Sequence, residues 1–204
     1  MEQFYLEKPS ISRKDDVLEY MEEHQKNQSD INGAGSFDEV LDGLSYEACL
    51  EKSLKLENKE YANSINKCPR KTFFLIRKHD NKLIGMISIR YDLTEELLQF
   101  VGHIGYGIRP TERGKGYNKI NLYLGLIEAQ KLGLSRVMLG CSVSNTPSDK
   151  TIQALGGILE RCEVDPSDNT LSNVYWIDVK KSLYEYSSVY VPYIVSEELE
   201  LTEM

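Results

Sequence analysis

One continuous segment, residues 100–134, constrains the fold most; it reads FVGHIGYGIRPTERGKGYNKINLYLGLIEAQKLGL. Its first part is rich in β-branched and aromatic residues and stops at Pro110, which is typical of a strand. Its last part carries apolar residues at helical spacing from Ile120 to Ile127 and ends near Gly133. The segment therefore predicts a strand that leads through a glycine-rich turn into a helix, as in α/β proteins.

The turn itself, Arg113 to Asn118, gives the predicted helix no capping side chain. The first N–H groups of a helix have no partner inside it, and a glycine inside a helix costs about 1 kcal/mol relative to alanine. We therefore expect the helix to begin near Gly114 to Gly116 with bare N–H groups. Together with Arg113 and Lys115 this predicts an anion site, most naturally for phosphate. A water-capped helix after a flexible turn is the alternative.

The residues before this segment predict a strand, two helices and a hairpin. QFYLEKP reads as a first strand, and two helical patterns follow on either side of the glycine-rich NGAGSFDEVLDG. KTFFLIRK and LIGMISIRYDL, joined through Asp80 and Asn81, are typical of a β-hairpin.

The residues after the segment predict a strand, a helix and two closing strands. SRVMLGCSV is a short apolar strand, and Thr146 to Asp149 has the spacing of a capping box with proline at the first helical position. ILERCEV and LSNVYWIDV are the closing strands.

The resulting order, βααβββαβαββ, predicts a single α/β (α+β) domain whose mixed central sheet of about six or seven strands is flanked by helices. We expect this domain to span residues 1–183. The tyrosine-rich C-terminal extension, residues 184–204, then belongs to the same domain or forms a contact of a homodimer. We expect its tyrosines to pack there rather than to line an active site.

Composition excludes several classes of function. The 204 residues carry a net charge of −8, which argues against a nucleic-acid partner because such surfaces need clustered cations. No apolar run approaches the roughly 18 residues of a membrane span, so we expect no membrane partner. The first residues show no secretion signal, and the four cysteines form no Cys-x-x-Cys pair. We therefore expect a cytoplasmic protein with reduced cysteines and no metal site.

The stretch GHIGYGIRPTERGKGYNKI resembles the acetyl-CoA motif of the GNAT superfamily of N-acetyltransferases. That motif is Arg/Gln-x-x-Gly-x-Gly/Ala, and residues 113–118 depart from it only at Asn118. The order of elements is also similar, as is CSVSNTPSDKTIQALGGILE, so the resemblance covers roughly residues 2 to 180.

The resemblance implies acetyl-CoA as the cofactor and direct acetyl transfer to a primary amine of a small molecule or peptide. It implies that the backbone from Tyr106 to Ile108 pairs with the pantetheine arm, in a slot that a bulge in this strand opens against SRVMLG. It implies that N–H groups of the glycine-rich turn hold the pyrophosphate. The implied cofactor-binding residues are Tyr106, Gly107, Ile108, Arg113, Gly114, Lys115, Gly116, Tyr117, Asn118, Asn145 and Ser148.

His103 is the candidate catalytic base, since an unperturbed histidine with a pKa near 6.5 suits proton abstraction at neutral pH. The alternative for His103 is a histidine with satisfied hydrogen bonds in the core. Many members of the superfamily carry a tyrosine acid seven residues after the position of Asn145, and Ile152 stands there. This departure favours a second class of function, a non-catalytic acyl-CoA-binding or sensing domain. The acceptor amine depends on the N-terminal helices and the NGAGS loop, where the sequence carries no motif.

Overall fold

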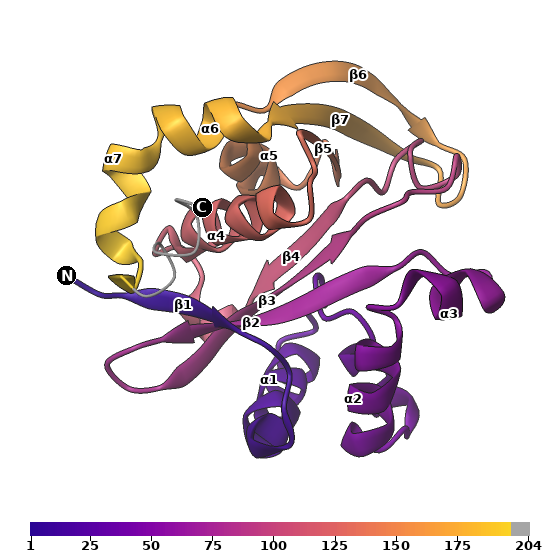
Figure 1. Ribbon diagram of the computed structural model, residues 1–204, viewed down its shortest axis with the longest axis vertical. Coiled ribbons are helices and arrows are strands. Elements are labelled where there is room, and N and C mark those ends of the chain that lie inside the picture. Colours follow the sequence, from indigo (N-terminus) through magenta and orange to yellow (C-terminus); the bar gives the residue numbers. More distant parts are fainter. Residues whose placement is uncertain (197–204) are drawn as a thin grey trace.

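The computed structural model describes residues 1–196 and folds into one α/β unit with seven strands, so the predicted fold class and strand number are confirmed (Figure 1). The strands form two antiparallel sheets rather than one continuous ladder. The first sheet has the order β1 (Phe4–Glu7), β2 (Arg70–Arg77), β3 (Lys82–Arg90), β4 (Ile104–Ile108). The second has the order β5 (Arg136–Ser142), β7 (Thr170–Asp178), β6 (Ile158–Asp165).

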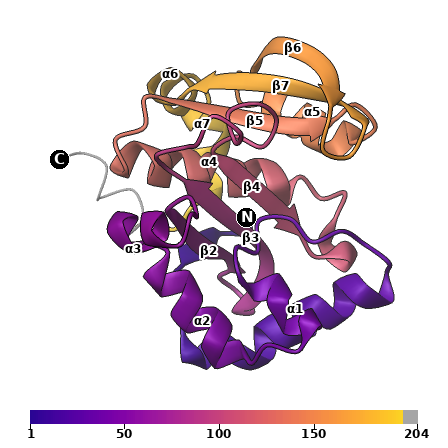
Figure 2. The ribbon, with the colours of Figure 1, turned by 90° about the vertical axis from the view of Figure 1, so that its right-hand side faces the viewer.

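Helices cover both faces of the first sheet (Figures 1 and 2). On one face lie α1 (Lys14–Lys26), α2 (Tyr46–Lys55) and α3 (Lys59–Ser64). On the other lies α4 (Tyr117–Lys131), between the two sheets, followed along the chain by α5 (Thr146–Gln153), α6 (Val179–Glu185) and α7 (Ser187–Tyr190). None of these described helices is long and apolar enough to cross a bilayer.

The apolar residues of β2 and β3 are buried on both faces, because α1 and α2 cover one side and α4 the other. Phe74 and Met86 belong to the core beneath α1 and α2, whereas Leu75 and Ile87 belong to the core around α4. The α4 helix is itself buried nearly all round: Leu122 and Leu126 are buried as well as Ile120, Tyr123, Leu124 and Ile127, which share the face expected from the sequence. Its position between two sheets accounts for this burial.

The C-terminal extension packs on α4 and β1 as far as residue 196. The Tyr123 hydroxyl donates to the Leu183 carbonyl at 2.9 Å, and the rings of Tyr123 and Tyr190 lie 5.2 Å apart. The Val195 N–H donates to the Phe4 carbonyl at 3.1 Å. The last part of the predicted extension, residues 197–204, lies outside the described residues.

Candidate active site

The entry loop of α4, residues 113–116, has the bare geometry that the sequence predicts. The helix begins after Gly116, which occupies the N-cap with φ 84° and offers no side-chain cap. Gly114 is also left-handed, with φ 79°, and a Cβ added at either glycine would meet nothing within 4 Å. Among residues 1–196 no acceptor binds the N–H groups of Gly114, Lys115 or Gly116. Three donors therefore stand open at the positive end of a fifteen-residue helix.

The two cations of the entry loop are held differently. Arg113 turns back, donating from Nε to the Ile108 carbonyl at 3.0 Å and from Nη2 to Ser29 Oγ at 2.7 Å. Lys115 is half exposed and donates from Nζ to Glu112 Oε2 at 2.7 Å. Arg113 thus braces the loop against β4, while the Lys115 ammonium can leave its partner for an incoming anion.

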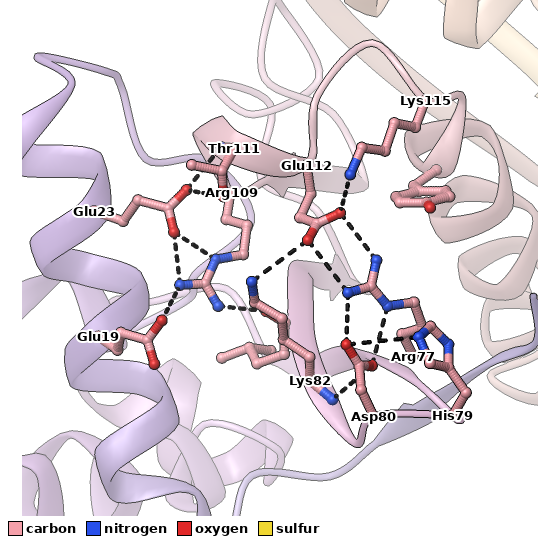
Figure 3. A network of polar contacts seen from close by, with 12 residues as sticks. Glu19, Glu23, Arg77, His79, Asp80, Lys82, Arg109, Thr111, Glu112 and Lys115 are labelled. Carbon is pink, nitrogen blue, oxygen red and sulfur yellow. Dashed lines mark hydrogen bonds and ion pairs between the residues drawn. The ribbon is translucent and has the colours of Figure 1, made fainter.

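Glu112 ties the entry loop to the β2–β3 turn, as Figure 3 shows. Its carboxylate is 5% exposed and accepts from Arg77 at 3.0 Å, Lys82 at 3.4 Å and Lys115 at 2.7 Å. Burial raises the pKa of Glu112, but hydrogen bonds from Lys115 and Arg77 outweigh this and hold the pKa below its usual value. Arg77 also binds Asp80 and lowers the pKa of that carboxyl to about 2.

Arg109 ties the other side of the same loop to α1 (Figure 3). Its guanidinium is almost fully buried and donates to Glu23 and Glu19, both at 2.6 Å. Glu23 in turn accepts from the N–H and the hydroxyl of Thr111. The loop is therefore held from two sides before any ligand binds. Sequence reasoning missed the ion pairs with Arg77, Glu19 and Glu23 because these partners lie far from Glu112 and Arg109 in the sequence.

The strands β4 and β5 meet only at one end. The His103 N–H donates to the Met138 carbonyl at 2.8 Å, and the Met138 N–H donates to His103 Nδ1 at 2.9 Å. Beyond this contact the two strands belong to different sheets and share no ladder, and we call this unpaired stretch the β4–β5 split. Because β3 and β4 pair in regular register, the bulge expected within β4 is absent. β4 and β5 separate near Gly102, which has φ 75°. There the His103 imidazole, rather than a backbone carbonyl, accepts the hydrogen bond from the Met138 N–H.

The far wall of the split is the start of α5. Asn145 is its N-cap, accepting from the Ser148 N–H at 3.2 Å, so the predicted capping box at Thr146 is wrong by one residue. The Tyr106 hydroxyl reaches across from β4 and shares a hydrogen bond of 2.9 Å with Ser148 Oγ. Burial raises the pKa of Tyr106. The structure thus brings Tyr106, Asn145 and Ser148 together, while Gly107 and Ile108 lead from Tyr106 to the entry loop.

Among the other residues of interest, His103 is 9% exposed. Burial lowers its pKa to about 4, and the positive charge of Arg90 adds to this effect against the hydrogen bond with Met138. Its ring packs edge-on against Trp176, with centroids 6.0 Å apart. This is the geometry of the core-histidine alternative. Ile152 is fully buried, and burial raises the pKa of the Cys141 thiol to about 11, as expected for an unreactive thiol.

A hollow of about 500 Å³ lies beside the entry loop. Its lining includes Lys115, Gly116 and Lys119 from the start of α4, and Tyr190 and Tyr193 from the C-terminal extension. The expectation that the extension's tyrosines pack rather than line an active site stays a prediction; Tyr190 packs on Tyr123 and also borders this hollow. Asn118, next to this hollow in sequence, has a buried side-chain oxygen without a hydrogen-bond partner among the described residues.

Free backbone N–H groups at a helix start, beside the unpaired edge of β4, are an arrangement suited to a phosphate-bearing cofactor. Residues 42–156, more than half of the chain, match the model of the acetyltransferase (GNAT) family, and the chain belongs to this family. It is thus an acetyl-CoA-dependent N-acetyltransferase by class, with acetyl-CoA as cosubstrate.

Solved structures share this fold. The ribosomal-protein-S5-alanine acetyltransferase of Vibrio fischeri aligns with a TM-score of 0.63 and 18% identity, over 87% of this chain and 94% of that one. The microcin C7 self-immunity acetyltransferase MccE, in complex with acetyl-CoA and AMP, aligns with a TM-score of 0.59 and 19% identity, over 85% of this chain and 91% of that one. The spermidine/spermine N-acetyltransferase SpeG of Vibrio cholerae aligns with a TM-score of 0.58 and 16% identity, over 90% of this chain and 98% of that one. No curated protein sequence matches the chain.

Proposed function

We propose that the protein moves the acetyl group of acetyl-CoA directly to a primary amine of a small molecule or peptide at the β4–β5 split. The observation that carries this proposal is the α4 entry loop, with three unpartnered N–H groups at the wide end of the split. Acetyl-CoA supplies the acetyl thioester. Two of the three structural neighbours named above are acetyltransferases for a ribosomal protein alanine and for spermidine or spermine, which supports an amine acceptor without naming it.

The chain's own residues divide the binding task in this proposal. The N–H groups of residues 114–116 hold the pyrophosphate, and Lys115 exchanges Glu112 for a phosphate oxygen. The edge of β4 that faces the split, from Tyr106 to Ile108, pairs with the amides of the pantetheine arm as an added strand would. Tyr117, Asn118, Asn145 and Ser148 complete the proposed contacts with the cofactor.

Proton handling follows from the two side chains at the split. With a pKa of about 4, His103 is a weak base, so we assign it the role of joining β4 to β5 and expect the amine to arrive deprotonated. The Tyr106 hydroxyl, on the wall of the split, then donates a hydrogen bond to the leaving sulfur in place of the tyrosine absent at Ile152.

A panel of amines assayed by thiol release from acetyl-CoA tests the proposal. We expect turnover with at least one amine class, and we expect Gly116→Asp to lose it while remaining folded. Binding of acetyl-CoA without turnover on any amine would instead support the acyl-CoA-sensing alternative. A homodimer stays a prediction, to be checked by light scattering.

A further inference from the structure

Two arginines lie directly opposite each other on neighbouring strands of the first sheet. Arg70 of β2 pairs with Arg90 of β3 in the register of the ladder. Like charges placed directly opposite destabilise a sheet. Neither guanidinium forms an ion pair with a carboxylate within residues 1–196: Arg70 donates to Ser36 Oγ at 3.0 Å, and Arg90 reaches the Gly102 carbonyl at 3.5 Å.

The pair is also poorly solvated. Burial lowers the pKa of both guanidiniums, and for Arg90 the neighbouring Arg70 adds to the effect. The Nε of Arg70 is buried and has no hydrogen-bond partner. The carboxylates of Asp38 and Glu39 lie close enough to raise the pKa of Arg70 against the effect of burial, but neither forms an ion pair with it, and Glu39 is engaged by Lys52 at 2.6 Å. Two half-buried like charges that form no direct ion pair among the described residues are a cost to the fold, and proteins carry such costs at functional sites.

The position of the pair relates it to the split. The Arg90 N–H donates to the His103 carbonyl at 2.7 Å, so Arg90 lies at the end where β4 and β5 meet. A Cβ added at Gly105 would lie 3.8 Å from Arg90 Nη1 and 3.7 Å from the Gly33 N atom. Through Gly33 and Ser36 the glycine-rich loop, residues 32–36, therefore borders both Gly105 and the arginine pair.

We infer that Arg70 and Arg90 together bind an oxyanion of the acceptor, so that the acceptor is an amine that also carries a carboxylate or a phosphate. This inference rests on the proposed acetyl transfer, because it places the acceptor at the narrow end of the split. An oxyanion would satisfy the free donors and offset the repulsion between the guanidiniums, which a polyamine cannot do. The net charge of −8 would not attract an anion, so the arginine pair must supply the attraction locally.

Kinetics with matched amines test the inference. Glutamate and phosphoethanolamine represent the carboxylate and phosphate sources, and cadaverine and spermidine are the cationic counterparts. We expect kcat/KM to favour an anionic amine and Arg90→Met or Arg70→Met to raise its KM at least ~10-fold, since hydrogen bonds to charged groups have this size. The KM for acetyl-CoA should not change. Lys71→Met is the control. This substitution also removes one positive charge from β2, but Lys71 pairs with Ile89 and lies on the opposite face of the sheet from the two arginines.

Thermal unfolding gives a readout without turnover. With CoA at saturation to fill the entry loop, succinate or inorganic phosphate should raise the Tm of the wild type and of Lys71→Met but not of Arg90→Met. Without added anion, Arg90→Met should melt at or above the wild-type Tm, because the repulsion is gone; a purely structural arginine would lower it.

The outcomes separate the inference from the proposed function. Efficient acetylation of spermidine, with the KM for anionic amines unchanged in Arg90→Met, would overturn the inference and leave acetyl transfer standing. If no amine is acetylated, acetyl transfer fails and the Tm experiment decides alone. An anion shift lost in Arg90→Met then supports the oxyanion site, and the absence of any shift overturns it.

Discussion

The imidazole of His103 illustrates how one side chain can decide where a sheet ends. By accepting the Met138 N–H through Nδ1, it satisfies a backbone donor that a neighbouring strand would otherwise bind. The proton of the neutral ring must then sit on Nε2. Leaving the buried Met138 N–H without an acceptor would cost on the order of 1–3 kcal/mol.

Two substitutions distinguish a structural role of His103, joining β4 to β5, from a role as the catalytic base. His103→Asn places an oxygen near the position of Nδ1, so we expect it to retain most of the wild-type Tm and most of kcat. His103→Ala should lower the Tm because the Met138 N–H loses its acceptor. Unfolding curves and kcat/KM profiles between pH 6 and 9 provide the measurements. A stable His103→Asn protein that loses about 10²-fold in kcat, together with a limb of its pH profile, would restore His103 as the base.

The free energy of unfolding should also depend on pH through His103. Its pKa is about 4 in the fold and near 6.5 when unfolded, so between these values the unfolded chain binds more protons. The free energy of unfolding should therefore fall as the pH drops from about 6.5 towards 4, with no contribution from His103 above that window. Burial lowers the pKa of His24 as well, which adds a fall of the same sign. Urea midpoints should fall less steeply with acid in His103→Asn than in the wild type.

Tyr106 is the remaining residue whose chemistry can be tested alone. Tyr106→Phe removes the hydroxyl that faces Ser148 but keeps the ring, so we expect kcat to fall on the order of 10²-fold with little change in the KM for acetyl-CoA. Ser148→Ala breaks the same hydrogen bond and should cost much less, because Tyr106 keeps its hydroxyl. Equal losses in both variants would mean that the hydrogen bond, not the donor, matters.

At the scale of elements, the start of α4 is the part that the sequence predicts best. The glycines of the entry loop predict a helix without a side-chain cap, and Gly116 occupies the N-cap with a positive φ. The start of α5 is one residue off, because Asn145 and Thr146 are both good caps and only the geometry chooses between them.

Gly116→Asp tests the entry loop against a control at the other end of α4. Gly133 has φ 79° and, like Gly116, open space where a Cβ would go, so Asp at either position should bring similar backbone strain of about 1–2 kcal/mol. Acetyl-CoA should raise the Tm of the wild type and of Gly133→Asp but not of Gly116→Asp, where the carboxylate meets the pyrophosphate. An undiminished shift in Gly116→Asp would place the phosphates elsewhere.

At the scale of the whole molecule, the sequence predicts the order of the seven strands and of α1, α4 and α5, but not the break between α2 and α3, the helices α6 and α7, or the division into two sheets. Local patterns of apolar residues and glycines are enough for the β2–β3 hairpin and for α4. The division depends on the contact of His103 with Met138, and the rigidity of the entry loop depends on Glu112 with Arg77; each pair lies 35 residues apart. The cross-strand meeting of Arg70 and Arg90 likewise requires the register of the hairpin, which a pattern of residue types does not give.

Because the two sheets share so few hydrogen bonds, the cosubstrate should act on both of them. We expect acetyl-CoA to slow hydrogen exchange at the amides of β4 and β5 together, since its pantetheine arm would fill the split between them. The amides of β1, on the far edge of the first sheet, are the internal reference and should change little. Protection confined to α4, with β4 and β5 unchanged, would contradict binding in the split.

The hydrogen bond from Val195 to Phe4 has a consequence for how the chain is made. β1 is the outer strand of its sheet, and its free edge is covered where Ile194 bridges to Phe4. Those covering residues are synthesised long after β1, and contacts so distant in sequence form late. Until then the nascent protein presents an uncovered edge, which is a template for pairing with another chain. A chain that stops before Ile194 would keep that edge bare and should aggregate during synthesis, even though every residue of the proposed site would be present.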